Sequence, residues 1–231
     1  MPEPLLQVTK QPFLSRSVEG PLRYQTTDVQ LLMPLIAFPS NDITRTALTK
    51  LLEAIIATQT TEAKLQIFKE VSRAPLVLAQ IADKQLLEPI NPFESIRLAT
   101  FPIFRQNLIS DQSLLTSTTF DTLSPIIFTL PQDEQVLEMS LEEVVSTMYP
   151  SWFTECVNLL WFMYDLDTGN KTGIRDQATL SKIKTEWLDP IMNRVGEWKR
   201  EAEGGEGEAR VGFVIQRLVD ALERARQTIG R

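Results

Sequence analysis

Pairs of carboxylates are the residues of this chain whose type and spacing could do chemistry. Glu143 directly follows Glu142, and Asp167 lies two residues after Asp165. Two carboxylates that are buried together can divide the roles of general acid and general base between them. Acidic residues are almost never fully buried without a partner, so such pairs usually lie on a solvated face. We therefore predict no catalytic residue from these pairs.

The chain has no histidine and one cysteine, Cys156. Histidine is the most frequent general base and metal ligand, so its absence removes a Cys–His nucleophile and any Cys/His zinc site within the chain. Cys156 stands in an apolar run, where a free cysteine behaves as a small buried hydrophobic residue. A single cysteine cannot form an intrachain disulfide, which favours an intracellular compartment, cytoplasmic or nuclear. No cofactor is predicted.

The loop that starts at Asp165 resembles a degenerate EF-hand calcium loop, because it stands between two apolar helical stretches. Asp167 falls at the third ligand position and Asp176 at the twelfth. Gly169 falls at the fifth position, where an oxygen ligand is needed, and Asn170 at the sixth, where the turn requires glycine. We predict a Gly/Asn turn that ends at Asp176 as a helix N-cap, and no metal ligand. A calcium-responsive module is kept as an alternative.

The overall composition is that of a folded protein with acidic character. The 231 residues are 43% hydrophobic and 23% charged, with a net charge of −7, so a sizeable core is expected. Nucleic-acid and anionic-membrane binding rely on clusters of Lys and Arg. The negative net charge of this chain therefore argues against nucleic acids and anionic membranes as partners. The longest apolar runs, near residues 29–38 and 156–164, are too short to span a bilayer. We expect other protein subunits as partners and no small-molecule ligand.

The order of elements along the chain predicts an all-α fold. Residues 1–27 are rich in proline and are predicted to form an extended arm, and residues 28–200 a helical, repeat-like domain. Residues 201–208 consist of four glutamates, three glycines and one alanine and are predicted to be an acidic hinge. Residues 209–231 repeat apolar positions at alternating spacings of four and three, the pattern of a packed amphipathic helix that caps the domain or pairs with another chain.

Particular helices can be anticipated inside the domain. The stretch 151–165 is so densely apolar that it should be central to the core. A long helix is expected over 176–201, with a kink at Pro190. The helix that opens after the cap cluster Ser40–Asp42 is predicted to place five apolar residues on one face: Ile43, Ala47, Leu51, Leu52 and Ile55.

Three stretches of sequence look alike, at residues 42–47, 94–99 and 134–139. Each begins with an acidic residue and runs into an apolar stripe at helical spacing, and the first two share an arginine followed two residues later by alanine. In these arginines, Arg45 and Arg97, the chain resembles HEAT or armadillo repeat proteins. The resemblance implies a right-handed solenoid of antiparallel helix pairs with a scaffolding role, and it supplies no catalytic residue. An irregular helical bundle is the alternative.

The residues most suited to a protein partner lie in the last two helical stretches. Trp187 and Trp198 are eleven residues apart, which puts them on nearly one face of a helix. Leu218 and Leu222 belong to the C-terminal apolar pattern. All four can either pack in the core or form an aromatic and aliphatic surface for another protein. We therefore predict a non-enzymatic scaffold or adaptor in a larger intracellular complex, with a carboxylate-dependent helical enzyme or ligand-binding protein as the alternative.

Overall fold

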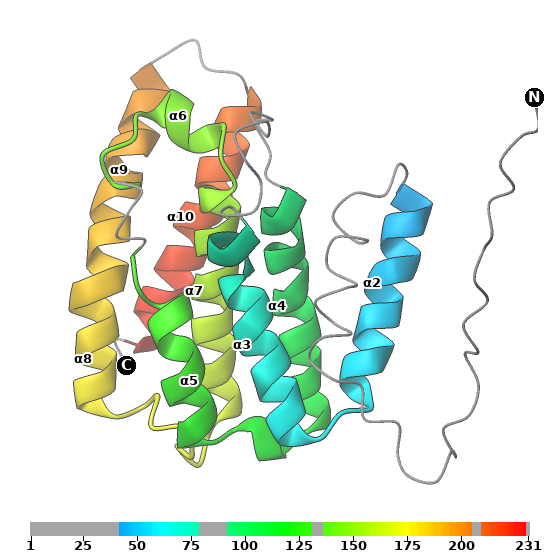
Figure 1. The fold of residues 1–231 in the computed structure, drawn as a ribbon. Helices are drawn as coiled ribbons and strands as arrows, with labels where there is room; N and C mark the ends of the chain where they lie inside the picture. The colour runs from blue at the N-terminus through cyan, green and yellow to red at the C-terminus, as the bar shows by residue number, and fades with distance from the viewer. Residues whose placement is uncertain (1–41, 79–91, 131–135, 205–208, 230–231) are drawn as a thin grey trace, which may run out of the picture.

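The computed structural model describes residues 42–78, 92–130, 136–204 and 209–229 (Figure 1). Within these ranges every regular element is helical, which confirms the predicted all-α class. The helices are α2 (Asp42–Ala57), α3 (Thr61–Leu78), α4 (Pro92–Ser110), a 3-10 turn (Gln112–Leu114), α5 (Ser117–Ile127), α6 (Leu141–Val145), α7 (Tyr149–Leu166), α8 (Gln177–Ile183), a π-helical turn (Lys184–Leu188), α9 (Asp189–Gly204) and α10 (Ala209–Ile229).

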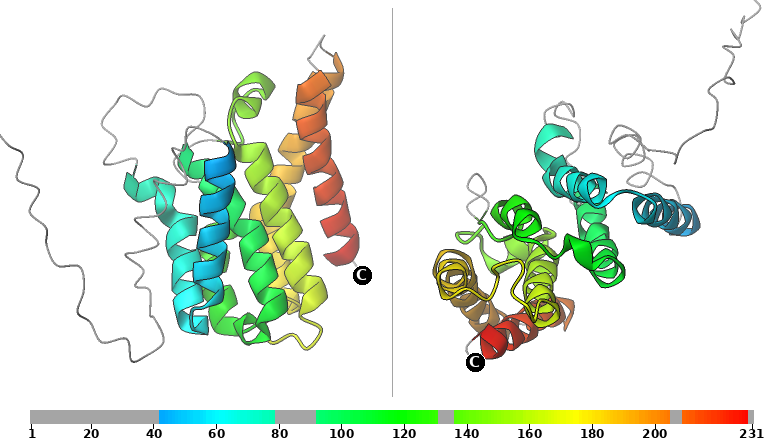
Figure 2. Two further views of the ribbon diagram at one scale, coloured as in Figure 1. Left: turned by 90° about the vertical axis from the view of Figure 1, so that its right-hand side faces the viewer. Right: turned by 90° about the horizontal axis from the view of Figure 1, so that it is seen from below.

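The long helices lie in two layers, and each runs antiparallel to the long helix that follows it (Figures 1 and 2). One layer contains α2, α4, α7 and α10 in that order, and α7 contacts both α4 and α10. The other layer contains α3, α5 and the continuous α8–α9 helix. The helix α2 therefore stands at one end of the stack and α10 at the other. Whether the helix pairs are HEAT or armadillo units stays a prediction.

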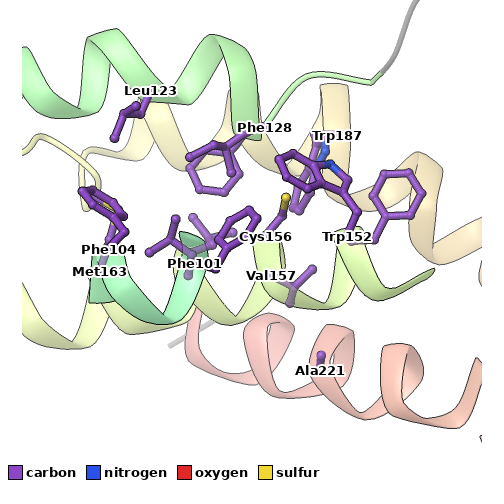
Figure 3. Close-up of a cluster of buried hydrophobic side chains, with 14 of the residues drawn as sticks. Phe101, Phe104, Leu123, Phe128, Trp152, Cys156, Val157, Met163, Trp187 and Ala221 are labelled. Atoms are coloured by element: carbon purple, nitrogen blue, oxygen red, sulfur yellow. The ribbon is translucent and has the colours of Figure 1, made fainter. Parts of the chain in front are cut away.

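The central helix of the core is α7, as its apolar sequence predicts. Its buried residues cover more than half of the circumference of the helix, while Trp161 and Asp165 are exposed; the buried residues are Pro150, Trp152, Phe153, Thr154, Cys156, Val157, Leu159, Leu160 and Met163. Cys156 is fully buried, as expected. Figure 3 shows Val157 of α7 above Ala221 of α10, where a small residue lets the two helices approach closely. Burial over most of a helix is the arrangement expected for the middle of a layered helical protein.

The third of the three similar stretches does not form the expected helix. Residues 136–138 are a turn, and the next helix, α6, begins only at Leu141. The start is fixed by a capping box: the Ser140 backbone N–H donates to Glu143 Oε2 at 2.8 Å, and Glu143 N–H donates to Ser140 Oγ at 3.3 Å. Local capping thus outweighs the apolar spacing upstream of Ser140. The helix predicted to start at Glu134 is wrong for the described residues.

Prolines are accommodated inside helices more often than their sequence suggests. Pro102 lies inside α4, and Pro75 lies inside α3. The expected long helix over 176–201 is present, but it contains the π-helical turn directly before Asp189 and Pro190. Proline has no N–H to donate and its ring crowds the carbonyl four residues earlier, so a wider turn at this point relieves the crowding.

Several expectations concern residues outside the described ranges. These are the N-terminal arm and residues 205–208 of the predicted hinge. The hinge expected over 201–208 starts too early, because residues 201–204 are the last turn of α9. The side chains of Arg45 and Arg97 are also outside what the structure describes, so their predicted equivalence stays a prediction. The C-terminal helix expected over 209–231 is present as α10, which packs on α7 and α9.

Candidate functional site

The four residues proposed for a partner are all buried within the chain. Trp187, Trp198 and Leu218 are 0% exposed and Leu222 is 2% exposed. Trp187 makes an edge contact with Phe128, with ring centroids 5.4 Å apart. These side chains hold α9 and α10 to the rest of the protein, and a partner could reach them only if those helices moved. Their role in partner binding stays a prediction.

The segment before α6 is fastened to α9 through one carbonyl. Trp198 Nε1 donates to Met139 O at 2.9 Å, and the Arg194 guanidinium donates to the same oxygen at 2.6 Å. Arg194 also pairs with Glu197 and lies over the Trp198 ring, 5.4 Å from its centroid. Charge-assisted hydrogen bonds of this kind are the stronger ones in proteins. Hydrogen bonds as well as apolar packing therefore hold α9 to the segment before α6.

The outward face of α10 is polar, as expected for a helix that closes a stack. Its buried positions are Ile215, Leu218, Ala221, Leu222 and Ala225. Its exposed positions are Gly212, Phe213, Gln216, Arg217, Asp220, Glu223, Arg224, Arg226 and Gln227. Phe213 is the one large apolar residue in that exposed set, and single exposed apolar residues are normal on protein surfaces.

The helix α2 differs because it is apolar on two sides. Leu52, Ile55 and Ile56 face the core, at 7% exposure or less. Ile43 is 84% exposed and Leu51 is 47% exposed, although both were predicted to share one face of the helix with Leu52 and Ile55. That expectation is wrong because each step of four residues turns about 40° past a full turn. Residues 43 and 55, three such steps apart, therefore point in different directions.

The outward apolar residues of α2 form a continuous stripe. Ile43, Ala47, Leu51 and Ala54 follow each other at spacings of four, four and three, and all four are exposed. Neighbours at these spacings lie side by side on a helix. The stripe runs about 16 Å along the helix, and its alanines leave room for another backbone to approach. We call these four residues the α2 stripe. The helix α2 itself lies at the edge of the described part of the molecule (Figure 2).

The EF-hand-like loop satisfies its own buried carboxylate. Asp167 is 2% exposed and accepts hydrogen bonds from the N–H groups of Lys171 and Thr172 and from Thr172 Oγ1, at 2.6–2.8 Å. Burial alone would raise the pKa of Asp167, but these bonds outweigh burial and the pKa is lowered. Asp165 is exposed, and Asp176 precedes α8 and accepts from Asn170 Nδ2 at 2.7 Å. In this arrangement the loop is held by internal hydrogen bonds.

A polar cluster that the sequence did not suggest joins α3 to the end of α4. Lys64, which is 7% exposed, donates to Asp111 Oδ2 at 3.0 Å, and Thr61 Oγ1 donates to the same oxygen at 3.3 Å. Ser113 donates to the other oxygen of Asp111. The hydrogen bond from Ser113 and the one from Lys64 lower the pKa of Asp111. The cluster could not be predicted from the sequence because Lys64 and Asp111 are 47 residues apart.

Few features of the described residues suit a small ligand. Glu143 is used by the capping box, and hydrogen bonds from Ser140 lower its pKa, while Glu142 is exposed. One cavity, with about 10 Å³ for the centre of a water molecule, lies among Phe68, Thr100, Phe101, Phe104, Leu123, Ile127 and Leu159. That volume is about the minimum for one water. Groups of three metal-binding side chains are absent from the described residues.

Comparison of the chain with protein-family models, with curated proteins and with solved structures gave no match. None of the helices in the described part of the chain is both long and apolar enough to cross a membrane. The candidate functional surface therefore rests on the geometry of this molecule, and the α2 stripe is its clearest feature.

Proposed function

We propose that this protein is a non-enzymatic adaptor or subunit of a larger intracellular assembly, and that the α2 stripe is where a protein partner docks. The observation that carries the proposal is the continuous exposed run from Ile43 to Ala54 on a helix whose opposite face already packs in the core. A run of apolar residues on one face is a feature of docking surfaces, whereas scattered apolar residues are not.

The chemistry of the stripe indicates the kind of partner. Of the described side chains on α2, the charged ones are Lys50 and Glu53, and the stripe itself is uncharged. Alanines between two larger aliphatic residues favour an apolar helix as partner, because a helix can approach closely over them and fit its ridges between Ile43 and Leu51. The single buried cysteine, Cys156, supports the intracellular part of the proposal.

The test is affinity purification of the tagged full-length protein from its native cell, with quantitative mass spectrometry. Leu51→Glu places a charge in the stripe, and Gln227→Glu adds the same charge to the polar face of α10 as a matched control. We expect a stoichiometric partner with the wild type and the control, and a loss of about tenfold or more with Leu51→Glu, since a buried unpaired charge is costly. A partner retained equally by both variants would refute the stripe as the docking surface.

A further inference from the structure

The serine that directly precedes α6 stands in an acidic stretch of the sequence. Ser140 is followed by Leu-Glu-Glu, so glutamates occupy the second and third positions after it, and Glu138 precedes it by two positions. Ser140 and these three glutamates are all exposed. The sequence contains no Lys or Arg between Arg105 and Lys171. A basic groove that binds this stretch of chain would therefore meet only acidic side chains, and complementary charge favours such binding.

The hydroxyl group of Ser140 has a structural role that a phosphate group would remove. It donates to Glu143 Oε2 at 2.9 Å, and Glu143 N–H donates to Ser140 Oγ at 3.3 Å. A phosphate ester has no hydrogen on this oxygen, and it carries a charge of about −1.5 to −2 at neutral pH. Glu201 of α9 brings a second carboxylate to this place, because it accepts from the Leu141 N–H at 3.2 Å. Carboxylates from two elements would therefore repel the phosphate.

The cation that contacts this segment in the described part of the chain is Arg194. Its guanidinium donates to Met139 O at 2.6 Å, pairs with Glu197, and lies 3.9 Å from Glu201 Oε1. Two carboxylates thus already share the charge of one guanidinium, which leaves no excess of positive charge for a phosphate on Ser140. We therefore expect repulsion to outweigh attraction at this position.

The segment 136–145 covers a buried part of α9. Trp198 Nε1–H donates to Met139 O at 2.9 Å, and Trp198 is fully buried, as are Val136 and Val144. A helix of five residues is not stable by itself in water, so α6 keeps its place through these contacts and through its cap. Figure 1 shows α6 beside the end of α9, far from α2. Loss of the cap would therefore loosen the segment and uncover Trp198.

We propose that Ser140 is a phosphorylation site for a kinase with a basic substrate groove, and that the phosphate releases residues 136–145 from α9 and exposes the indole N–H of Trp198. In the reaction, the Ser140 oxygen bonds to the terminal phosphorus of a nucleoside triphosphate. The bond from that phosphorus to the bridging oxygen breaks, the nucleoside diphosphate leaves, and the hydroxyl proton passes to a base of the kinase. The site lies at the α9–α10 end of the stack, so this inference is independent of the α2 stripe.

The modification is tested on the full-length protein with a purified acid-directed serine kinase and ATP, and mass spectrometry locates the phosphate. Thr118→Ser supplies a matched second site, because position 118 is exposed and is followed three residues later by Asp121, but has no acidic residue two positions later. We expect incorporation at Ser140 to be about tenfold faster than at position 118, because more negative charge surrounds it. Equal rates at the two positions would overturn the proposed site. Absence of phosphate from Ser140, while an acidic control peptide is phosphorylated in the same mixture, would also overturn it.

The release is tested by hydrogen–deuterium exchange of the unmodified and the phosphorylated protein. Amides of α6 should exchange about tenfold faster after phosphorylation, because the cap is lost and repulsion is added, while amides of α3 and α5 should keep their rates. Ser140→Asn is the control, since asparagine also caps helices but cannot be phosphorylated, and kinase treatment should leave its exchange unchanged. Acrylamide quenching of tryptophan fluorescence should increase on phosphorylation as Trp198 becomes accessible. Unchanged exchange in fully phosphorylated protein would overturn the release, and so would slower exchange of α6, which would mean that Arg194 holds the phosphate in place.

Discussion

The two ends of the helical stack are built differently. At the C-terminal end α10 buries Leu218 and Leu222 and presents charged residues to solvent. At the N-terminal end α2 buries Leu52 and Ile56 but also exposes the α2 stripe. A terminal helix of a layered protein needs one polar side to end the stack, and α10 has it. The polar face of α10 therefore ends the stack, whereas the exposed apolar face of α2 is suited to contact with another helix.

The largest effect that tests this comparison is expected at α10. Leu218→Ala removes a fully buried side chain from the contact with α7 and α9, and should lower the free energy of unfolding by about 3 kcal/mol. Urea unfolding followed by circular dichroism measures the loss. A change below about 1 kcal/mol would mean that α10 is not part of the cooperative core, and the contrast with α2 would disappear.

A smaller effect is expected at the clamp between α3 and the end of α4. Asp111→Asn should lower stability at pH 7 by about 1–2 kcal/mol, because Lys64 loses the charge partner of its buried ammonium group. The pKa of Asp111 is lower in the folded protein than in the unfolded chain. The stabilisation is therefore complete above the ordinary aspartate pKa, near 3.8, and is lost as the pH falls through the lower folded value.

The clamp prediction is checked by unfolding the wild type and Asp111→Asn over a pH series. The difference between them should be constant at neutral pH and shrink on acidification below about pH 4. A difference that grows as the pH falls would contradict the assigned direction of the pKa shift. Ser113→Ala is the companion variant, since it removes the side-chain hydrogen bonds of Ser113 with Asp111 and Thr61 and keeps the ion pair of Asp111 with Lys64.

The smallest effect on stability is expected at the α2 stripe. Leu51→Ala should cost well under half of what Leu218→Ala costs, about 1 kcal/mol or less, because Leu51 is 47% exposed to solvent. The same urea titrations compare the two variants directly. Equal losses would show that α2 is covered as thoroughly as α10, and the account of two unlike ends would fail.

Periodicity was sufficient to predict the all-α class, the central position of α7 and the burial of Cys156. A long, densely apolar stretch carries that information because such a helix must bury most of its surface. The outward position of Ile43 was missed because helical geometry was applied too loosely: the twelve residues from Ile43 to Ile55 turn about 120° past full turns, so the two cannot share one narrow face. The turn before Ser140 was missed because a capping box is a local signal that overrides apolar spacing.

The polar sites also differ in how far they could be predicted: contacts between neighbouring residues were predictable, and contacts between distant residues were not. The turn after Asp165 and the cap position of Asp176 follow from nearby residues and were predicted. Other contacts join residues far apart in the chain, and no pattern in the sequence predicts them. These are the Lys64–Asp111 pair and the hydrogen bonds from Arg194 and Trp198 to Met139. Trp187, Trp198, Leu218 and Leu222, the candidates for a partner surface, are buried in the core, the other position that their apolar and aromatic side chains allowed. Their role in partner binding stays a prediction.

The most direct test of the central claim is hydrogen–deuterium exchange of the full-length protein, alone and in complex with its purified partner. Amides of α2 should exchange several times more slowly in the complex, while amides of α10 should keep their rates, because the partner replaces solvent only along the α2 stripe. Protection confined to α10, or to any helix other than α2, would contradict the claim that the open end of the stack is the docking surface.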